Sequence, residues 1–354
     1  MNLLVLPGDG IGPELCQATQ SVLTALDERF SLNLEFDRAA IGFDSLEKQG
    51  STLPEAVIDQ ARQADGVILG PVSHADYPPR EQGGINPSGG LRMALDLFAN
   101  IRPSRAVEGV DCLAPDMDLV IVRENTEGFY ADRTMHAGSG EMMPSPDLAL
   151  AVRKISRDGS RQIVEAACKL AMTRRRKLSI VHKANVLKLS DGLFMDAAAE
   201  VLKDYPEIES DDQHVDAMAS LLIRQPGRFD VIVTTNMFGD ILSNEAAELS
   251  GGLGLGGSLN AGHDHAIAQA AHGSAPEIAG QDIANPVALI KSAAMLLDWI
   301  GRRNHRSEFP QAATALNLAV DGLIKDRPHR TPDIGGRLGT QAFAALLAQS
   351  ISGS

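Results

Sequence analysis

The sequence predicts an α/β protein built on a parallel or mixed sheet, and three observations carry that prediction. Short apolar runs alternate with longer stretches of helical periodicity along the 354 residues. The composition is 44% hydrophobic but only 4% aromatic, so the core is expected to be aliphatic. Glycine-rich loops fall at residues 83–90 and 251–257. Strands that are bounded by helices indicate a parallel or mixed sheet.

The elements of the first part of the chain follow in a regular order. The apolar run 3–7 predicts a strand, and a helical stretch follows it at 13–30. A second strand is expected at 33–39, then a helix near 54–64 and a third strand at 65–72. Strand, helix and strand thus alternate from the start.

Three more apolar runs continue the pattern. They predict strands at 118–124, 177–184 and 230–236, and helical periodicity follows each of them. The polar stretch 133–147 contains Gly, Pro and Met, and we expect it to leave the core.

Charge and composition exclude several classes of function. The formal net charge of −14 argues against nucleic acid as a partner, because nucleic acid requires a basic face. No run of about 18 apolar residues is present, so no membrane span is expected, and the start of the chain lacks the features of a signal peptide. Cys16, Cys112 and Cys168 are odd in number and widely spaced, which suits a reducing cytosol. A cytoplasmic location is expected.

A glycine cluster near the N-terminus permits a dinucleotide-binding interpretation. The sequence GDGIG at 8–12 follows a strand and opens a helix, and Asp37 lies near the end of the next strand. The spacing does not fit a Rossmann motif, because the third glycine comes one residue early and Pro13 takes its place. The cluster is therefore a weak signal for a phosphate site.

Several cationic side chains near expected element ends are candidates for binding an anion. Arg92, Arg102 and Arg123 are either surface residues or a clamp for a carboxylate, which arginine binds through paired hydrogen bonds. Lys183 closes an apolar strand, where it is either a base with a lowered pKa or a lysine whose charge reaches solvent.

Acidic and amide side chains on two expected helices are candidates for a metal site. Asp240 and Asn244 stand four residues apart and so share one helix face, and Asp216 begins another helix. Their oxygens suit Mg²⁺ or Mn²⁺. The alternative is that the two acids only favour their helix N-termini.

Long motifs in a consistent order resemble the β-decarboxylating dehydrogenases, which act on isocitrate, 3-isopropylmalate, homoisocitrate, tartrate and D-malate. The resemblance runs nearly end to end. The motifs are LPGDGIGPE, LRMALDLFANIRP, RENTEGFY, HKANVLK, VDAMA, NMFGDILSNEAA and HGSAPEIAGQDIANP.

The resemblance implies a two-domain isopropylmalate-dehydrogenase-like fold with mixed sheets that is not a Rossmann fold. Residues 1–98 and 245–354 would form a discontinuous cofactor-binding domain, and residues 99–244 a substrate and dimerisation domain. The segment near 133–147 would be an intersubunit arm of a homodimer. Lys183 and Asp216 would then enter the active site of the other subunit.

The resemblance also implies a role for each motif residue. The three arginines would hold the carboxylate that is lost, Tyr130 would act as general acid, and Lys183, with Asn185 beside it, would be the base near the C2 hydroxyl. The metal would be bound by Asp216, Asp240 and Asn244. Cofactor-binding residues would be His272, Gly273, Ser274, Ala275, Glu277 and Asn285.

Glu277 indicates the cofactor, and Asn244 marks a departure from the family. An acid at 277 would accept the ribose hydroxyls of NAD and repel the phosphate of NADP. Most active family members carry a second Asp where this chain has Asn244. An amide oxygen can bind a hard cation but brings no charge, so weaker metal binding is expected. The alternative class is a non-catalytic regulatory paralogue, against which the retained Lys183 and Tyr130 argue.

The segment ahead of Arg92 bears on the substrate. Isopropylmalate enzymes place leucines there, whereas isocitrate enzymes carry a Ser and an Asn. This chain has Asn86 and Ser88 at those two positions with the residues exchanged. We therefore expect an isocitrate-like (2R)-malate with a polar group on C3, and 3-isopropylmalate, tartrate and D-malate are the alternatives.

Overall fold

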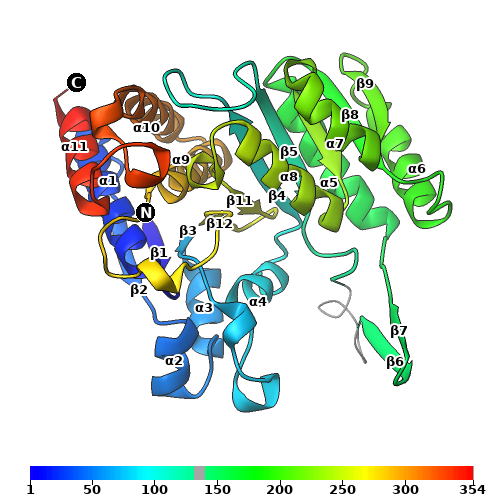
Figure 1. Cartoon of the computed structure of the whole chain (residues 1–354), viewed down its shortest axis with the longest axis horizontal. Helices are drawn as coiled ribbons and strands as arrows, with labels where there is room; N and C mark the ends of the chain where they lie inside the picture. Colours follow the sequence, from blue (N-terminus) through cyan, green and yellow to red (C-terminus); the bar gives the residue numbers. More distant parts are fainter. Residues whose placement is uncertain (131–139, 354) are drawn as a thin grey trace.

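One mixed sheet organises the molecule. The computed structural model describes residues 1–130 and 140–353, and its ten-stranded sheet has the order β2-β1-β3-β12-β11-β4-β5-β10-β8-β9 (Figure 1). The strands are β1 (Asn2–Leu6), β2 (Glu35–Arg38), β3 (Gly66–Leu69), β4 (Ala99–Arg105), β5 (Asp118–Glu124), β8 (Lys177–His182), β9 (Glu209–His214), β10 (Val231–Thr234), β11 (Leu259–Ala261) and β12 (Ala266–Gln269). The helices are α1 (Gly12–Phe30), α2 (Gly42–Gln49), α3 (Glu55–Gln63), α4 (Pro87–Ala94), α5 (Arg157–Met172), α6 (Ser190–Leu202), α7 (Val215–Arg224), α8 (Asn236–Leu249), α9 (Val287–Arg303), α10 (Glu308–Lys325) and α11 (Thr340–Ser352).

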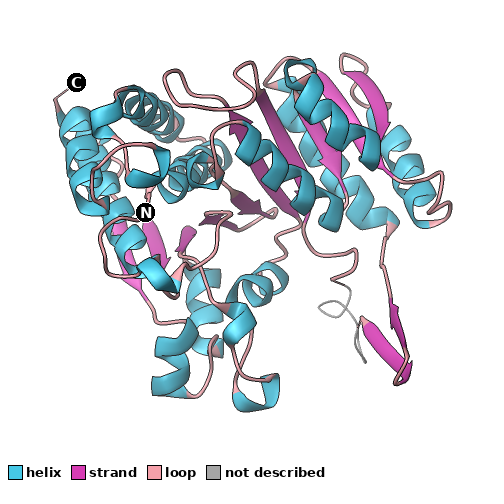
Figure 2. Ribbon diagram, viewed as in Figure 1, coloured by secondary structure: helices cyan, strands magenta, loops and turns pink. Residues whose placement is uncertain are grey.

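The sheet is antiparallel at its centre and parallel on both sides. β4 pairs antiparallel with β5 and with β11, and β11 pairs antiparallel with β12. The other neighbouring strands are parallel. The predicted α/β class with a mixed sheet is confirmed. Helices cover both faces (Figure 2).

Alternation along the strands sorts the core into layers. In β5, Leu119 and Ile121 pack with buried residues of α7 and α8, whereas Val120 and Val122 pack with those of α5 and α6. Successive strand residues point to opposite faces, so one apolar run supplies two cores. The N-terminal strand behaves alike: Leu4 and Leu6 belong to the cluster of α3 and α4, and Leu3 and Val5 to that of α1, α9, α10 and α11.

The two ends of the chain build one side of the sheet and the middle builds the other (Figure 1). The strands β1, β2, β3, β11 and β12 come from residues 2–69 and 259–269, and β5, β8, β9 and β10 from residues 118–234. The division into 1–98 plus 245–354 and 99–244 stays a prediction, and its second boundary falls within α8 (Asn236–Leu249).

A hairpin extends from the middle of the chain (Figure 1). β6 (Glu141–Ser145) and β7 (Leu148–Ala151) form a separate two-stranded antiparallel sheet, and their residues are exposed. This hairpin overlaps the expected arm at 133–147, of which residues 133–139 lie outside the described part. Among the helices of residues 1–130 and 140–353, none is both long and apolar enough to cross a membrane.

Candidate active site

Two buried arginines lie on the sheet face that α8 covers. Arg102 pairs in register with Ile121, and Ile121 packs in the cluster beneath α7 and α8. Arg123 stands two residues after Ile121, so its side chain leaves the same face. Two of the three predicted clamp residues therefore meet, although one comes from β4 and the other from β5.

Asp240 joins the two arginines. Its Oδ1 accepts a hydrogen bond from Arg123 Nη1 and lies 3.3 Å from Arg102 Nη1. Asn236, at the start of α8, accepts hydrogen bonds from Arg123 Nε and Nη2 at 2.9 and 2.7 Å. Arg102 Nη1 also donates to Ser243 Oγ at 2.8 Å. The first two turns of α8 thus fix both guanidinium groups.

The charges in this cluster do not cancel. Two guanidinium groups meet one carboxylate, which leaves a net positive charge among these three groups. Desolvation by burial, followed by repulsion from Arg123, lowers the pKa of Arg102 to about 10. Arg102 still carries its charge near neutral pH, in a setting where a second carboxylate would be strongly attracted.

Asp240 and Asn244 share a helix face, as their spacing predicted. Asn244 Oδ1 accepts a hydrogen bond of 3.2 Å from Arg102 Nη1, the same nitrogen that faces Asp240. A carboxylate oxygen and an amide oxygen on successive turns suit a hard divalent cation, with one charge fewer than two acids would supply. Across residues 1–130 and 140–353, no three His, Cys, Asp or Glu side chains gather into a metal-binding group. The oxygen donors fit a cation that also takes ligands from elsewhere.

Lys183 and Asp216 form a separate pair. Lys183 follows β8, and its Nζ donates a hydrogen bond to Asp216 Oδ1 at the start of α7. That hydrogen bond lowers the pKa of Asp216 below its usual value. Asn185 is exposed beside them. In this chain Asp216 pairs with a lysine and Asp240 pairs with two arginines.

The backbone of Lys183 is held by buried side chains that the sequence did not single out. Its N–H donates to Asp191 Oδ2 at 2.6 Å, and the N–H of Ala184 donates to His182 Nδ1 at 3.0 Å. Asp191 also accepts from Arg153, which precedes α5. Asp191 lies 8 residues from Lys183 and 38 from Arg153, and no periodic pattern in the sequence marks it as a partner of either.

Other predicted residues lie around these groups. Arg123 Cζ lies 5.8 Å from the ring centroid of Tyr130, so the expected general acid stands over a clamp arginine. Arg92 and Ser88 stand four residues apart on α4. Asn86 caps that helix, and its Oδ1 accepts from Gly89 N at 3.2 Å.

The loop that begins at His272 rests on the N-terminal glycine cluster. Ile11 N donates to Ser274 O at 2.9 Å, and a Cβ on Gly10 would lie 2.0 Å from the same oxygen. Gly10 therefore permits the close contact. Ala275 adopts a left-handed φ of 38°, which is rare for a residue with a side chain. The GDGIG segment thus supports the predicted cofactor loop.

Two more features belong to this loop. Desolvation by burial lowers the pKa of His272, and its Nε2 is buried without a hydrogen-bond partner in the described part of the chain. Asn285 Nδ2 donates to Asp333 Oδ2 at 2.9 Å, which brings in an acid that the sequence did not mark. Gly273 and Glu277 are exposed.

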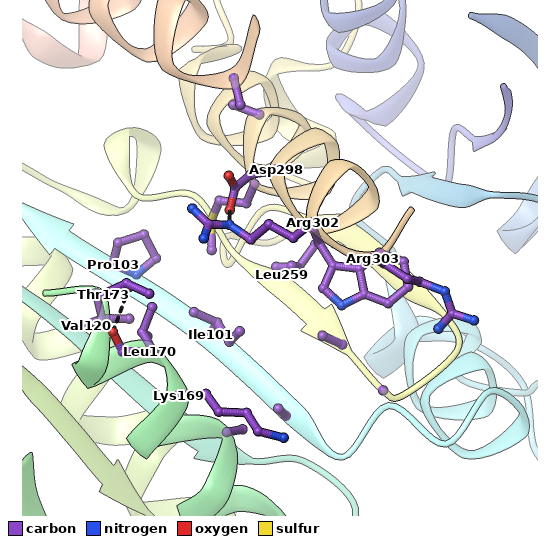
Figure 3. A pocket seen from close by; sticks show the side chains of 18 of the residues that line it. Ile101, Pro103, Val120, Lys169, Leu170, Thr173, Leu259, Asp298, Arg302 and Arg303 are labelled. Atoms are coloured by element: carbon purple, nitrogen blue, oxygen red, sulfur yellow. Dashed lines mark hydrogen bonds and ion pairs between the residues drawn. The ribbon is translucent and has the colours of Figure 1, made fainter. Parts of the chain in front are cut away.

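A large cavity lies elsewhere, between α5 on one side and α9 and α10 on the other (Figure 3). Its volume is about 970 Å³, and it contains none of the predicted site residues. Ile101 and Val120 form part of its floor, on the sheet face opposite Arg102 and Ile121. Arg302 at its rim already pairs with Asp298 at 2.7 Å. The polar cluster, and not this cavity, is the candidate active site.

Comparison with known proteins agrees with the geometry. A sequence model of the isocitrate/isopropylmalate dehydrogenase family matches residues 2–347. The chain is 42% identical to the 3-isopropylmalate dehydrogenase of Methanothermobacter thermautotrophicus, covering 99% of this chain and 98% of that one. It is 43% identical to the isocitrate/homoisocitrate dehydrogenase of Thermus thermophilus over the same shares. The crystal structure of isocitrate dehydrogenase from Methylococcus capsulatus superposes with a TM-score of 0.87 at 39% identity and covers 99% of both chains.

The chain has an α/β fold, and its buried arginine cluster keeps a net positive charge that would suit a carboxylate. Family and relatives make this chain a decarboxylating hydroxy-acid dehydrogenase. It belongs to the isocitrate/isopropylmalate dehydrogenase family.

Proposed function

We propose that the chain catalyses NAD-dependent, divalent-metal-dependent oxidative decarboxylation of a 3-substituted (2R)-malate, with an isocitrate-like substrate favoured. The observation that carries this proposal is the buried pair Arg102 and Arg123 with Asp240 as their shared carboxylate. The remaining positive charge suits a di- or tricarboxylate, and Asp240 stands beside it as a metal ligand.

The residues divide the reaction between them. Bound NAD would accept the hydride from C2, and a cation held by Asp240, Asn244 and Asp216 of the partner subunit would polarise the C2 oxygen. Lys183 of the partner subunit would take the proton of the C2 hydroxyl. Arg92, Arg102 and Arg123 orient the carboxylate that leaves as carbon dioxide. Tyr130 then protonates the carbon that the carboxylate has left.

Sharing of residues between two copies explains the separate pairs. Lys183 and Asp216 face each other on one part of the chain, while the arginines and Asp240 form another cluster. In a homodimer each cluster would meet its complement from the second copy, and the β6–β7 hairpin would reach across. No nucleic acid or membrane partner is proposed. The free thiols of Cys16, Cys112 and Cys168 suit the cytoplasm.

NAD is favoured over NADP because of the cofactor loop. Glu277 is exposed at the edge of that loop, where a carboxylate accepts hydrogen bonds from ribose hydroxyls and repels a phosphate. His272, Gly273, Ser274, Ala275 and Asn285 would surround the adenosine.

The C3 substituent is not decided by overall similarity, since the relatives named for isopropylmalate and for isocitrate/homoisocitrate are 42% and 43% identical to this chain. Asn86 and Ser88 favour a polar substituent. A 3-isopropylmalate, tartrate or D-malate substrate is the alternative.

The test is NADH formation with five substrates: isocitrate, homoisocitrate, 3-isopropylmalate, tartrate and D-malate. We expect turnover with Mn²⁺ or Mg²⁺, loss of turnover with a chelator, and the highest kcat/KM with isocitrate or homoisocitrate. Turnover of NADP in preference to NAD, or activity that survives the chelator, would contradict the proposal. A folded enzyme that is silent with all five substrates would contradict it as well.

A further inference from the structure

A row of buried polar side chains crosses the sheet on the face of the arginines. It runs from Arg102 through Asn100 on β4, Asn260 on β11 and Gln269 on β12 to Ser88 on α4. Asn100 pairs in register with Asn260, so the row runs perpendicular to the strands. All five residues are at most 9% exposed. We name this row the amide relay.

Arg102 fixes the direction of every hydrogen bond in the amide relay. A guanidinium group only donates, so Asn100 must present its carbonyl oxygen to Arg102 Nε, at 2.6 Å. The amide nitrogen of Asn100 then donates to Asn260 Oδ1 at 3.1 Å. The amide nitrogen of Asn260 is left to donate to Gln269 Oε1, at 3.4 Å. Neither asparagine can be turned over without breaking this order.

Ser88 stands at the end of the amide relay, and the order of donors and acceptors along the relay decides which way its hydrogen bond points. Gln269 presents an oxygen, so the 2.8 Å hydrogen bond between the two side chains must be donated by Ser88. A serine hydroxyl has one hydrogen and two lone pairs. Once the hydrogen is committed to Gln269, only the lone pairs remain for another partner.

We infer that the amide relay makes Ser88 a hydrogen-bond acceptor toward the substrate, and that Asn100, Asn260 and Gln269 are positioning residues which set specificity for the C3 substituent. This inference rests on the proposed function, in which Ser88 lies beside that substituent. A carboxylate on C3 needs hydrogen-bond donors, and Ser88 can donate to it only by giving up Gln269.

Asn86 supplies the donor that Ser88 lacks. Its Oδ1 is used as the cap of α4, where it accepts from Gly89 N, so its amide nitrogen takes no part in this cap. A carboxylate substituent is therefore bound through Asn86, and Ser88 suits a hydroxyl or a small apolar group. Two neighbouring polar residues thus have opposite hydrogen-bonding roles.

Single substitutions separate these roles. The quantity to measure is kcat/KM for isocitrate divided by kcat/KM for 3-isopropylmalate, in the Mn²⁺-loaded enzyme. Ser88→Ala is expected to change this ratio by less than about threefold, whereas Asn86→Asp, which keeps the cap oxygen and loses the donor, should lower it by about tenfold or more. A tenfold fall with Ser88→Ala would overturn the inference.

Removal of Gln269, the acceptor of the Ser88 hydroxyl, should raise the ratio of kcat/KM values in favour of isocitrate. Gln269→Met frees the Ser88 hydroxyl, and we expect the same ratio to rise by about three- to tenfold. The rise should vanish in the double variant Ser88→Ala/Gln269→Met. A loss of packing alone would lower kcat/KM equally for both substrates and leave their ratio unchanged. That result would also overturn the inference.

Neutron diffraction tests the hydrogen-bond direction without any turnover. Deuterium on Ser88 Oγ that points at Gln269 Oε1 supports the inference, and deuterium that points away from Gln269 overturns it. An enzyme that turns over no malate but shows the expected deuterium would reject the proposed function and retain the amide relay.

Discussion

The arginine cluster and the Lys183–Asp216 pair differ in how completely one chain builds them. The side chains of Arg102 and Arg123 are 10% and 4% exposed, and their partners Asp240 and Asn236 are fixed on α8. The side chains of Lys183 and Asp216 are 24% and 68% exposed. One region has two buried arginines held by several partners, and the other is a single ion pair that is more open to solvent.

The two regions are expected to differ in how much they affect the stability of the folded protein. Buried guanidinium groups need hydrogen-bond and charge partners, so removing one partner of the arginine cluster is expected to destabilise the folded protein. An exposed ion pair contributes little to folding, because water screens it. Lys183 and Asp216 are therefore free to exchange each other for a substrate or a metal. Four substitutions test this contrast, from the largest expected effect to the smallest.

Lys183→Met should abolish catalysis without unfolding the protein. Loss of a general base costs about 10²- to 10⁴-fold in kcat. Tm should change little, because the half-buried Lys183 pairs with an exposed Asp216 that water screens. Stopped-flow or steady-state NADH formation and a thermal melt measure the two effects. Lys177 begins β8, the strand that Lys183 follows, and it pairs with Glu209 at 3.2 Å. Lys177→Met is the matched control and should change neither quantity. A loss in kcat of less than tenfold would contradict the role of Lys183 as the general base.

Co-expression of Lys183→Met chains with Arg123→Met chains tests whether the two regions belong to one active site shared by two subunits. If active sites are shared across a dimer, each hybrid dimer keeps one site with both native residues, and random pairing should restore roughly a quarter of native activity. If one chain supplies both residues, the hybrids should stay as inactive as the parents.

Arg123→Met should damage both activity and folding. Its loss removes charge-assisted hydrogen bonds to Asp240 and Asn236, so kcat/KM is expected to fall about 100-fold and stability by about 2–3 kcal/mol. Urea unfolding and kinetics measure these effects. Arg330→Met is the control for a buried arginine away from the site, since Arg330 donates to the carbonyl oxygen of Ile324 at 2.7 Å. That variant should lose stability and retain kcat/KM; equal losses in both variants would count against the clamp.

Asn244→Asp should strengthen metal binding. A carboxylate at position 244 adds a charge one helical turn from Asp240, and Mn²⁺ affinity is expected to rise about tenfold. Calorimetry or Mn²⁺ paramagnetic resonance gives the affinity without turnover. Ser243→Ala removes another acceptor of Arg102 and leaves the metal oxygens in place, so it should not alter the affinity. Equal Mn²⁺ affinity in Asn244→Asp and native protein would show that residue 244 is not a ligand.

His272 should give the smallest effect, a mild pH dependence of cofactor binding. Burial lowers its pKa, so the folded loop favours the neutral ring. The stability from this preference is present above the ordinary pKa of about 6.5 and is lost as the pH falls below it. NADH fluorescence titrations should show affinity about two- to threefold weaker at low pH, with no such change in His272→Gln. An identical pH profile in the variant would assign the dependence to another group.

The sequence predicted the long elements well and the short or polar ones poorly. The helix expected at 13–30 is α1 (Gly12–Phe30), and the strand at 118–124 is β5 with the same bounds. β9 was missed because its residues ESDDQH carry no apolar signal at the edge of the sheet. β4 was missed because Pro103 and its arginines interrupt the run ANIRPSR.

The candidate site shows the same limit. The spacing of Asp240 and Asn244 was enough to put them on one face, and both do meet Arg102. The local sequence pattern did not predict that Asp240 would pair with two arginines, or that Asn236 would accept hydrogen bonds from one of them. The domain boundaries and the arm across a dimer stay predictions.

The sequence alone determined the periodicities of this protein and the chemistry of its motifs, because a strand repeats every two residues and a helix every 3.6. Tertiary structure decided which of those residues meet. Ser88 reaches Gln269 across 181 residues, and Arg102 reaches Ser243 across 141. Such contacts depend on the order and register of neighbouring strands, which a local pattern does not contain.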